Sequence, residues 1–321
     1  MFYALKDPDH LVRADRARIA EKYYCPFCHA QVILRKGTFY QSHFAHKKQC
    51  LSKTPLETSE HQDGKALLLM WAKAAGYFAR SEVYLQELAQ KPDILAKKKE
   101  QEFVIEFQCA PLSYQSLCQR TTGYKQAGYQ VIWVLGMNYR LKSKLDQKTA
   151  QFMHYSKKLG FYLIYLDVLE QRFEIDYALQ MADLLELRYS RGYATDLNAL
   201  KEFCQTDHHV SLAHLSLQQQ KQQLLALESY VDKIKYRLRK QAYAENITLQ
   251  QLFKANLSKR YYYPLWRTAC FYWKSKIYLQ YGEGSSALAP AYIVHHFAYK
   301  FAFITIEKKK IIFNEIQPEI P

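Results

Sequence analysis

The 321-residue sequence is short of glycine and proline, with 10 and 9 residues, which excludes a collagen-like or low-complexity chain. It has no uncharged apolar run of the ~20 residues that a membrane-spanning helix needs. The amino-terminal stretch MFYALKDPDHLVRADRARIA carries acids and lacks the apolar core of a secretory signal peptide. Seven cysteines in such a chain favour free thiols or metal ligands over disulfides. We therefore expect a cytoplasmic protein with no membrane span.

Acidic residues are scarce relative to basic ones. The chain holds 45 Lys and Arg against 30 Asp and Glu, a net charge of +15. A basic chain attracts polyanions, and aromatic rings, 15% of this sequence, can stack on unpaired bases. The basic excess is largest at the two ends, because residues 1–55 and 171–321 each carry +6 and residues 56–170 only +3. This distribution suits an enzyme with a central acidic site that acts on a polyanion.

Strand and helix signals divide the chain into three domains. Residues 1–55 predict a small β-rich module of two hairpins, with strands at 2–7, 11–14, 31–35 and 38–44. Residues 56–177 alternate helices and strands, and residues 178–321 are mostly helical and basic. In that last domain the amphipathic stretch 211–244 predicts one long helix, followed by helices at 247–257 and 265–281.

The middle domain predicts a mixed α/β fold. Ser59 with Gln62 is a capping-box signal for a first helix that ends at Gly76, and Ser113 can cap a second helix. The apolar run Tyr129–Leu135 is typical of a strand covered on both faces. The other expected elements are strands at 78–85, 93–96 and 102–109, a helix at about 142–159, and a hairpin at 161–168 and 172–177.

Cysteine and histidine residues gather in the first domain. Cys25 and Cys28 form a CxxC pair that suits a tetrahedral zinc ion, and His43, His46 and Cys50 follow. One helical turn would bring His46 and Cys50 together, whereas His43 and His46 would point to opposite faces of a strand. We expect Cys25, Cys28, His46 and Cys50 to hold a structural zinc, with His43 as the substitute. The alternative is a set of reduced thiols without metal.

Three acids in the middle domain point to a second metal. Glu106 lies within the apolar strand 103–108, where an uncompensated carboxylate is costly to bury. Asp93, across a hairpin, is its expected neighbour, and two adjacent carboxylates repel unless a cation lies between them. Mg²⁺ or Mn²⁺ is the natural compensation. Glu60 heads the buried stripe of the first helix and can point at the sheet, although an acid there also favours the helix dipole.

Basic and aromatic side chains near these acids are candidate DNA contacts. Arg120 and Tyr124 are four residues apart on one helix face, where they can contact a phosphate and a sugar or base, or simply pack. Lys233, Arg237 and Lys240 fall on one side of a helix. That arrangement fits a phosphate track and equally an ordinary solvated face.

These segments, in this order, resemble the competence protein CoiA family. The resemblance covers nearly all of residues 1–136 and is carried by CPFC, HFAH, SEHQDGKALL, KPDIL, VIEFQCAPLS, CQRTTGY and YQVIWVLG. It implies a restriction-endonuclease-like nuclease core of the PD-(D/E)xK type, behind a zinc-binding head and before an α-helical C-terminal domain. It also implies a role in natural transformation, where imported single-stranded DNA is processed and recombined.

The resemblance assigns residue roles. Asp93 and Glu106 would be the metal carboxylates and Glu60 the helix acid of the nuclease fold. Gln108 stands where the broader superfamily has Lys, so it can orient a water but cannot offset charge, although Gln is typical of the family resembled here. Lys65 or Arg120 could supply the missing charge.

The sequence thus predicts a Mg²⁺- or Mn²⁺-dependent deoxyribonuclease that acts in natural transformation and recombination. Its catalytic residues would be Glu60, Asp93, Glu106 and Gln108, and its DNA contacts Lys65, Arg120, Tyr124, Lys233, Arg237 and Lys240. The alternative is a catalytically weak scaffold of the same fold that binds single-stranded DNA and assists a RecA-type recombinase. Gln108 favours the scaffold, and the clustered acids oppose it. Other competence proteins are further expected partners.

Overall fold

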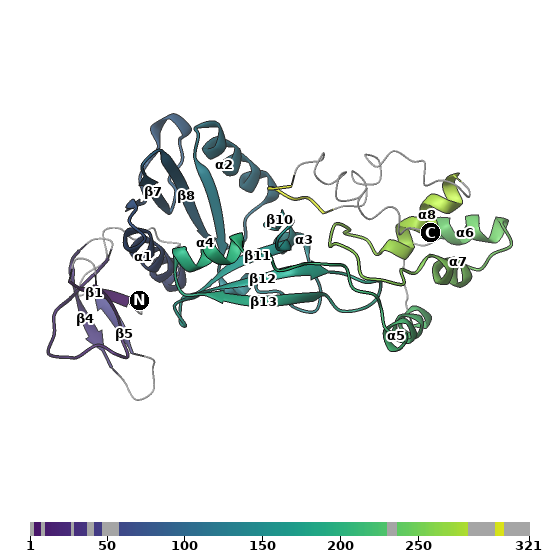
Figure 1. The fold of residues 1–321 in the computed structure, drawn as a ribbon, viewed down its shortest axis with the longest axis horizontal. Helices are drawn as coiled ribbons and strands as arrows, with labels where there is room; N and C mark the ends of the chain where they lie inside the picture. The colour runs from purple at the N-terminus through teal and green to yellow at the C-terminus, as the bar shows by residue number, and fades with distance from the viewer. Residues whose placement is uncertain are drawn as a thin grey trace. The chain divides into compact units, whose positions relative to one another are not determined.

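Figure 1 shows the fold of the chain in a computed structural model. The structure describes residues 3–7, 10–26, 29–36, 42–46, 58–229, 236–281 and 299–304. The chain forms two compact units. The first comprises Met1–Arg140, Ile164–Ile175 and Gly192–Gln205, and the second Leu141–Leu163, Asp176–Arg191 and Thr206–Pro321.

A five-stranded antiparallel sheet forms the N-terminal module of the first unit. Its order is β2-β1-β3-β4-β5, with β1 (Tyr3–Asp7), β2 (His10–Arg13), β3 (Tyr23–Tyr24), β4 (Gln31–Arg35) and β5 (His43–His46). The pair β1–β2 confirms the first hairpin expected from the sequence. Strand β4 also pairs with the strand that follows it, but Arg35 lies opposite His43, later in the chain than the expected strand at 38–44 implies. One core cluster of this module is small and consists of three alanines, Cys25, Val32 and the ring of Tyr23 packed on that of Phe44 at 4.9 Å between centroids. A core of this size leaves little margin of stability, which is why modules like it often contain a metal.

An eight-stranded mixed sheet is the second sheet of the molecule. Strand pairing follows β13-β12-β11-β9-β8-β7-β6, with β10 paired to β11. The pairs β6–β7 and β7–β8 are antiparallel, whereas β8–β9 is parallel, with a helix in the crossover. The bounds are β6 (Phe78–Ser81), β7 (Ile94–Lys98), β8 (Gln101–Gln108), β9 (Gln130–Leu135), β10 (His154–Ser156), β11 (Gly160–Asp167), β12 (Arg172–Gln180) and β13 (Arg188–Ala194). The division between the two units falls within β11, β12 and β13.

Two helices cover opposite faces of β8. Helix α1 (Ser59–Ala74) approaches so closely that a Cβ added at Gly64 would collide with the ring of Phe107. Helix α2 (Tyr114–Gln126) lies on the face of Glu106, whose carboxylate it contacts. Ser113 caps α2 as expected. The cap of α1 is one residue earlier than predicted, because the Thr58 hydroxyl accepts the N–H of His61.

Two long helices expected from the sequence are wrong. The stretch 142–159 holds the single turn α3 (Gln147–Ala150) and the strand β10, because pairing with β11 overrides the helical pattern. The stretch 211–244 begins with non-helical residues, since a capping box at Ser216 starts α5 (Leu217–Glu228). Helix α6 (Tyr236–Ala244) follows α5 along the chain, and residues 230–235 between them lie outside the described residues. The hairpin predicted at 161–168 and 172–177 is confirmed by β11 and β12.

Helices dominate the end of the second unit. Leu227 of α5 packs with Phe253 of α7 (Leu249–Asn256) and Phe271 of α8 (Cys270–Tyr281). Another helix, α4 (Leu197–Gln205), belongs to the first unit. Among the residues that the structure describes, none of the helices combines the length and the apolar character needed to cross a bilayer.

Candidate active site

Asp93 and Glu106 are neighbours at the end of the β7–β8 hairpin. Ile94 pairs with Ile105, so the next step of the ladder brings Asp93 opposite Glu106. The Oδ2 atom of Asp93 accepts the backbone N–H of Phe107 at 2.8 Å. The side chain of Asp93 is 14% exposed and that of Glu106 only 2%. We call these two carboxylates the acidic pair.

Helix α2 holds the buried carboxylate of Glu106. Its Oε1 atom accepts hydrogen bonds from Arg120 Nη2 and from the Tyr124 hydroxyl, each at 2.6 Å. Burial, and next the charge of Asp93, raise the pKa of Glu106 to about 7, while Arg120 and Tyr124 act in the opposite direction. The two carboxylates therefore repel one another, and a proton or a cation on the pair would relieve that repulsion.

Helix α1 supplies a histidine to the acidic pair that the sequence analysis did not consider. His61 Nε2 lies 3.2 Å from Asp93 Oδ2, and the imidazole stacks on the Phe107 ring at 5.8 Å between centroids. Its neighbour Glu60 directs Oε1 to the N–H of Met137, 3.2 Å away and just after β9. Glu60 is thus fixed to the backbone that follows β9, and His61 is the α1 residue that contacts Asp93.

An ion-pair network with one buried member, Lys65, lies beside Asp93. Lys65 is 1% exposed and donates to Glu82, which also accepts from Lys91 at 3.0 Å. The backbone N–H of Glu82 donates to the carbonyl of Asp93 at 3.1 Å. Glu82 adopts a left-handed φ of 55° and was not singled out from the sequence, because its partner Lys65 is 17 residues away.

The remaining candidates differ in accessibility. Gln108 is half-buried and donates its Nε2 to the carbonyl of Ala110 at 2.5 Å. Arg120 is 32% exposed and stacks over Trp133, whereas Tyr124 is buried. Lys240 is exposed on α6. Lys233 and the side chain of Arg237 lie outside the described residues.

The acidic pair fits a hard divalent cation better than a caged metal. Across the described ranges, no group of three or more His, Cys, Asp or Glu side chains is placed to hold a metal ion. Mg²⁺ typically uses one or two carboxylates and keeps several waters, so two adjacent carboxylates suffice. Asp93 and Glu106 each use one oxygen for the hydrogen bonds described above, which leaves Oδ1 and Oε2 for a cation.

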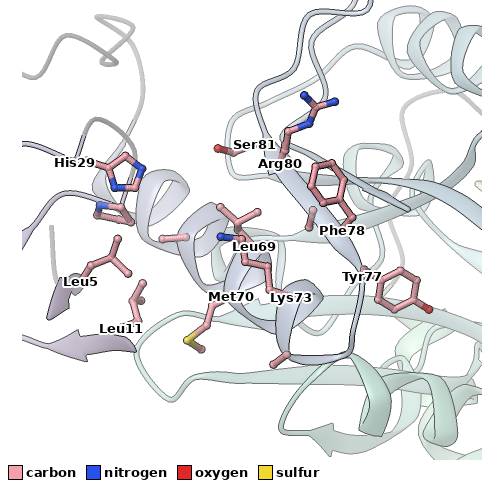
Figure 2. A pocket seen from close by; sticks show the side chains of 14 residues that line it. Leu5, Leu11, His29, Leu69, Met70, Lys73, Tyr77, Phe78, Arg80 and Ser81 are labelled. Atoms are coloured by element: carbon pink, nitrogen blue, oxygen red, sulfur yellow. The ribbon is translucent and has the colours of Figure 1, made fainter. Parts of the chain in front are cut away.

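A pocket in the first unit lies apart from the acidic pair. It measures about 870 Å³ and its lining includes neither Asp93 nor Glu106. Figure 2 shows its largely apolar walls, formed by Leu69 and Met70 of α1, Phe78 of β6, and Leu5 and Leu11 of the N-terminal module. The acidic pair is therefore not part of this pocket.

The predicted zinc ligands are only partly described. Cys25 is buried in the core of the N-terminal module, where its N–H donates to the carbonyl of Ala30 and its carbonyl accepts from the N–H of His29, both at 2.9 Å. His43 and His46 are the first and last residues of β5. Cys28 and Cys50 lie outside the described residues, so the ligand set stays a prediction.

Elemental analysis tests the zinc prediction. We expect the purified chain to carry one zinc ion and the Cys25→Ser variant to lose it, since four-ligand structural sites rarely tolerate the loss of a thiolate. Cys204→Ser, a half-buried thiol outside the module, is the matched control and should keep the metal. Zinc that is absent from the wild type, or retained by Cys25→Ser, would contradict the site.

Two regions of the chain match models of one known protein family. The family "Competence protein CoiA, nuclease-like domain" matches residues 57–183, and "Competence protein CoiA, N-terminal domain" matches residues 9–53. The chain belongs to the competence protein CoiA family. The acidic pair and its contacts from α1 and α2 lie in the nuclease-like domain of this CoiA chain.

A curated relative extends the comparison. The Competence protein CoiA of Bacillus subtilis (strain 168) is 33% identical over 123 residues. The match covers 38% of this chain and 33% of the relative, so the chain aligns with about a third of that protein's length. No solved structure matches the chain.

Proposed function

We propose that the chain is a divalent-metal-dependent deoxyribonuclease that processes imported DNA in natural transformation and recombination. The acidic pair carries this proposal. A buried Glu106 with a pKa raised to about 7, beside Asp93, is a costly arrangement that a bound cation would stabilise. The nuclease-like domain in which the pair lies supports DNA as the substrate.

Each side chain around the acidic pair then has a role. Asp93 and Glu106 hold the cation, which would supply positive charge to the scissile phosphate and lower the pKa of a water. Arg120 and Tyr124 position Glu106, and His61 positions Asp93. These contacts pre-organise the carboxylates before substrate arrives.

Four residues take roles that follow from their surroundings. Gln108 uses its amide nitrogen on Ala110, so its Oε1 can align a water but brings no positive charge. Lys65 and Tyr124 are buried and bonded to acids, so we assign them to the support of the site in place of the DNA contact expected from the sequence. Glu60 supports the loop after β9 through Met137.

A cleavage assay tests the proposal. We expect wild-type protein to cut labelled single-stranded DNA, and more slowly double-stranded DNA, only when Mg²⁺ or Mn²⁺ is added. Asp93→Asn should lose cutting by at least about 100-fold, since even groups that merely orient a metal ligand are worth ~10–100-fold. Asp167→Asn, a half-buried acid of the same unit and outside the acidic pair, is the control and should cut normally. Cutting without added metal, or unchanged in Asp93→Asn, would refute the nuclease.

One observation favours the alternative scaffold. Arg120 already donates to Glu106, so part of the charge of the acidic pair is balanced by the protein itself. A scaffold of this kind would bind single-stranded DNA and present it to a RecA-type recombinase without cutting it. Binding that persists in wild type and Asp93→Asn, with no cutting in either, would select the scaffold. Other competence proteins and a cytoplasmic site of action belong to both versions of the proposal.

A further inference from the structure

A cleft formed by the N-terminal module and by Gln171, which lies between β11 and β12, has four Lys and Arg side chains among its ten described lining residues and shares no residue with the acidic pair. The cleft measures about 420 Å³. We call it the basic cleft, and its charged and imidazole side chains are Lys6, His10, Arg13, Arg16, Arg18 and a single acid, Glu21. Such a density of positive charge in a concave surface concentrates anions.

Acidic neighbours neutralise only part of this charge. Glu21 is already occupied, because Oε1 accepts from Lys6 at 2.9 Å and Oε2 accepts from the Tyr23 hydroxyl at 2.8 Å. Arg13 lies 3.3 Å from a carboxylate oxygen of Asp15. Glu21 and Asp15 therefore offer two negative charges against the four cations of the cleft, which leaves an excess of positive charge.

Arg16 and Arg18 carry the unbalanced charge. Both side chains are exposed, and neither forms an ion pair with a residue that the structure describes. Guanidinium groups offer planar, paired N–H donors that match two oxygens of a phosphate. Two such groups, two residues apart and facing one cleft, suit adjacent phosphates or one phosphate held from two sides.

The segment that carries these arginines is held in place by the core. Ala14 and Ala17 are buried in the module, so the chain between Arg13 and Arg18 is anchored at two points. The N–H of Arg18 donates to the Tyr23 hydroxyl at 2.8 Å, which adds a third anchor. Because the backbone is fixed in advance, less conformational entropy is lost when the guanidinium groups bind a ligand.

We propose that the basic cleft binds the sugar-phosphate backbone of DNA. Among the described lining residues, Tyr23 is buried and uses its hydroxyl internally, so the exposed imidazole of His10 is the accessible ring beside four cationic side chains. The cleft therefore recognises the phosphates of DNA independently of the base sequence, and it binds both single-stranded and double-stranded DNA. The choice of DNA over other polyanions rests on the proposed function, but the cleft itself requires no cleavage.

Binding measurements on the full chain test this inference. The variant is Arg16→Gln with Arg18→Gln, and the control is Lys142→Gln with Lys144→Gln, which removes the same charge at exposed positions. Anisotropy of labelled single- and double-stranded oligonucleotides is followed from 50 to 200 mM salt. Neither divalent cation nor chelator is added, so cutting is avoided and any zinc is retained, and a gel confirms that the DNA stays intact.

We expect the arginine variant to bind DNA on the order of tenfold more weakly, because two phosphate contacts are lost. The slope of log K against log salt should fall by about 0.7–0.9 for each contact, and the control should retain both values. Arg16→Lys with Arg18→Lys should keep the slope, since the charge remains. A circular dichroism spectrum equal to that of the wild type excludes misfolding.

Each other outcome is decisive. Wild-type affinity in the arginine variant, or an equal loss in the lysine control, would overturn the basic cleft as a DNA site. Polyglutamate serves as a probe for an acidic protein partner. If the arginine variant binds DNA normally but no longer binds polyglutamate, the cleft is a site for such a partner, and this result would also overturn the proposal. Loss of binding in the arginine variant, with no cutting by the wild type, would support the cleft while refuting the nuclease.

Discussion

Replacing Glu106 by Gln should abolish metal-dependent cutting, a loss of at least about 100-fold, while the chain still folds. The amide is nearly isosteric and its oxygen can still accept from Arg120 and Tyr124, so the packing under α2 is preserved. The substitution removes the negative charge of Glu106, which we expect Mg²⁺ binding to require. Mg²⁺ should therefore raise the melting temperature of the wild type at pH 8 and leave that of Glu106→Gln unchanged.

The same variant reports on the pKa of Glu106. A carboxyl whose folded-state pKa is raised from 4.5 to about 7 keeps its proton in the folded state after the unfolded chain has released it. The metal-free wild type should then lose stability as the pH rises from about 4.5 to 7. Glu106→Gln should lack this component of the pH dependence. Identical pH profiles of the melting temperature in the two proteins would contradict the raised pKa.

Replacing Asp183 by Ala should destabilise the second unit by about 3–5 kcal/mol. The buried carboxylate accepts the Tyr262 hydroxyl at 2.9 Å, the N–H of Ser258 at 3.0 Å and the N–H of Cys270 at 2.7 Å. Cys270 is the first residue of α8, so the negative charge also favours the helix dipole. Alanine leaves these buried donors without an acceptor. Urea unfolding, with hydrogen exchange of peptides from α7 and α8, measures the loss.

Two companion variants make the Asp183 result specific. Asp183→Asn keeps one acceptor oxygen and should lose about 1–3 kcal/mol, because its amide group cannot accept from Ser258. Glu228→Ala removes an exposed acid of α5 in the same unit and should stay within ~0.5 kcal/mol of the wild type. If Asp183→Ala unfolds at the same urea concentration as Glu228→Ala, the carboxylate is not the centre of this unit's hydrogen bonding.

Local signals predicted those parts of the fold that local interactions decide. Ser113 caps α2, the continuous apolar run forms β9, and the first hairpin of the N-terminal module pairs as expected. The long helix expected at 142–159 failed because β10 gains more from pairing with β11 than the helix gains from propensity. The hydrophobic periodicity of one segment does not indicate whether that segment can pair with a strand that lies further along the chain.

The candidate site shows the same limit. Strand alternation and the hairpin placed Asp93 beside Glu106, since Asp93 directly precedes β7 and Glu106 lies on the adjacent strand β8. Nothing local marks His61 as the partner of Asp93, 32 residues away, or Glu82 as the partner of Lys65. The helix pattern indicated that Lys65 and Tyr124 lie near the site, yet it did not reveal that both are buried against acids.

The contact between Gly64 and Phe107 ties chemistry to a purely steric fit. The Phe107 ring occupies the space that a side chain at Gly64 would need, while its backbone N–H holds Asp93 and its ring supports His61. Any change in the separation of α1 from β8 must then displace the imidazole and the carboxylate together. The positions of His61 and Asp93 therefore depend on the absence of a side chain at Gly64, which lets α1 approach β8 closely. The distance between α1 and β8 thus determines how far apart the two side chains lie.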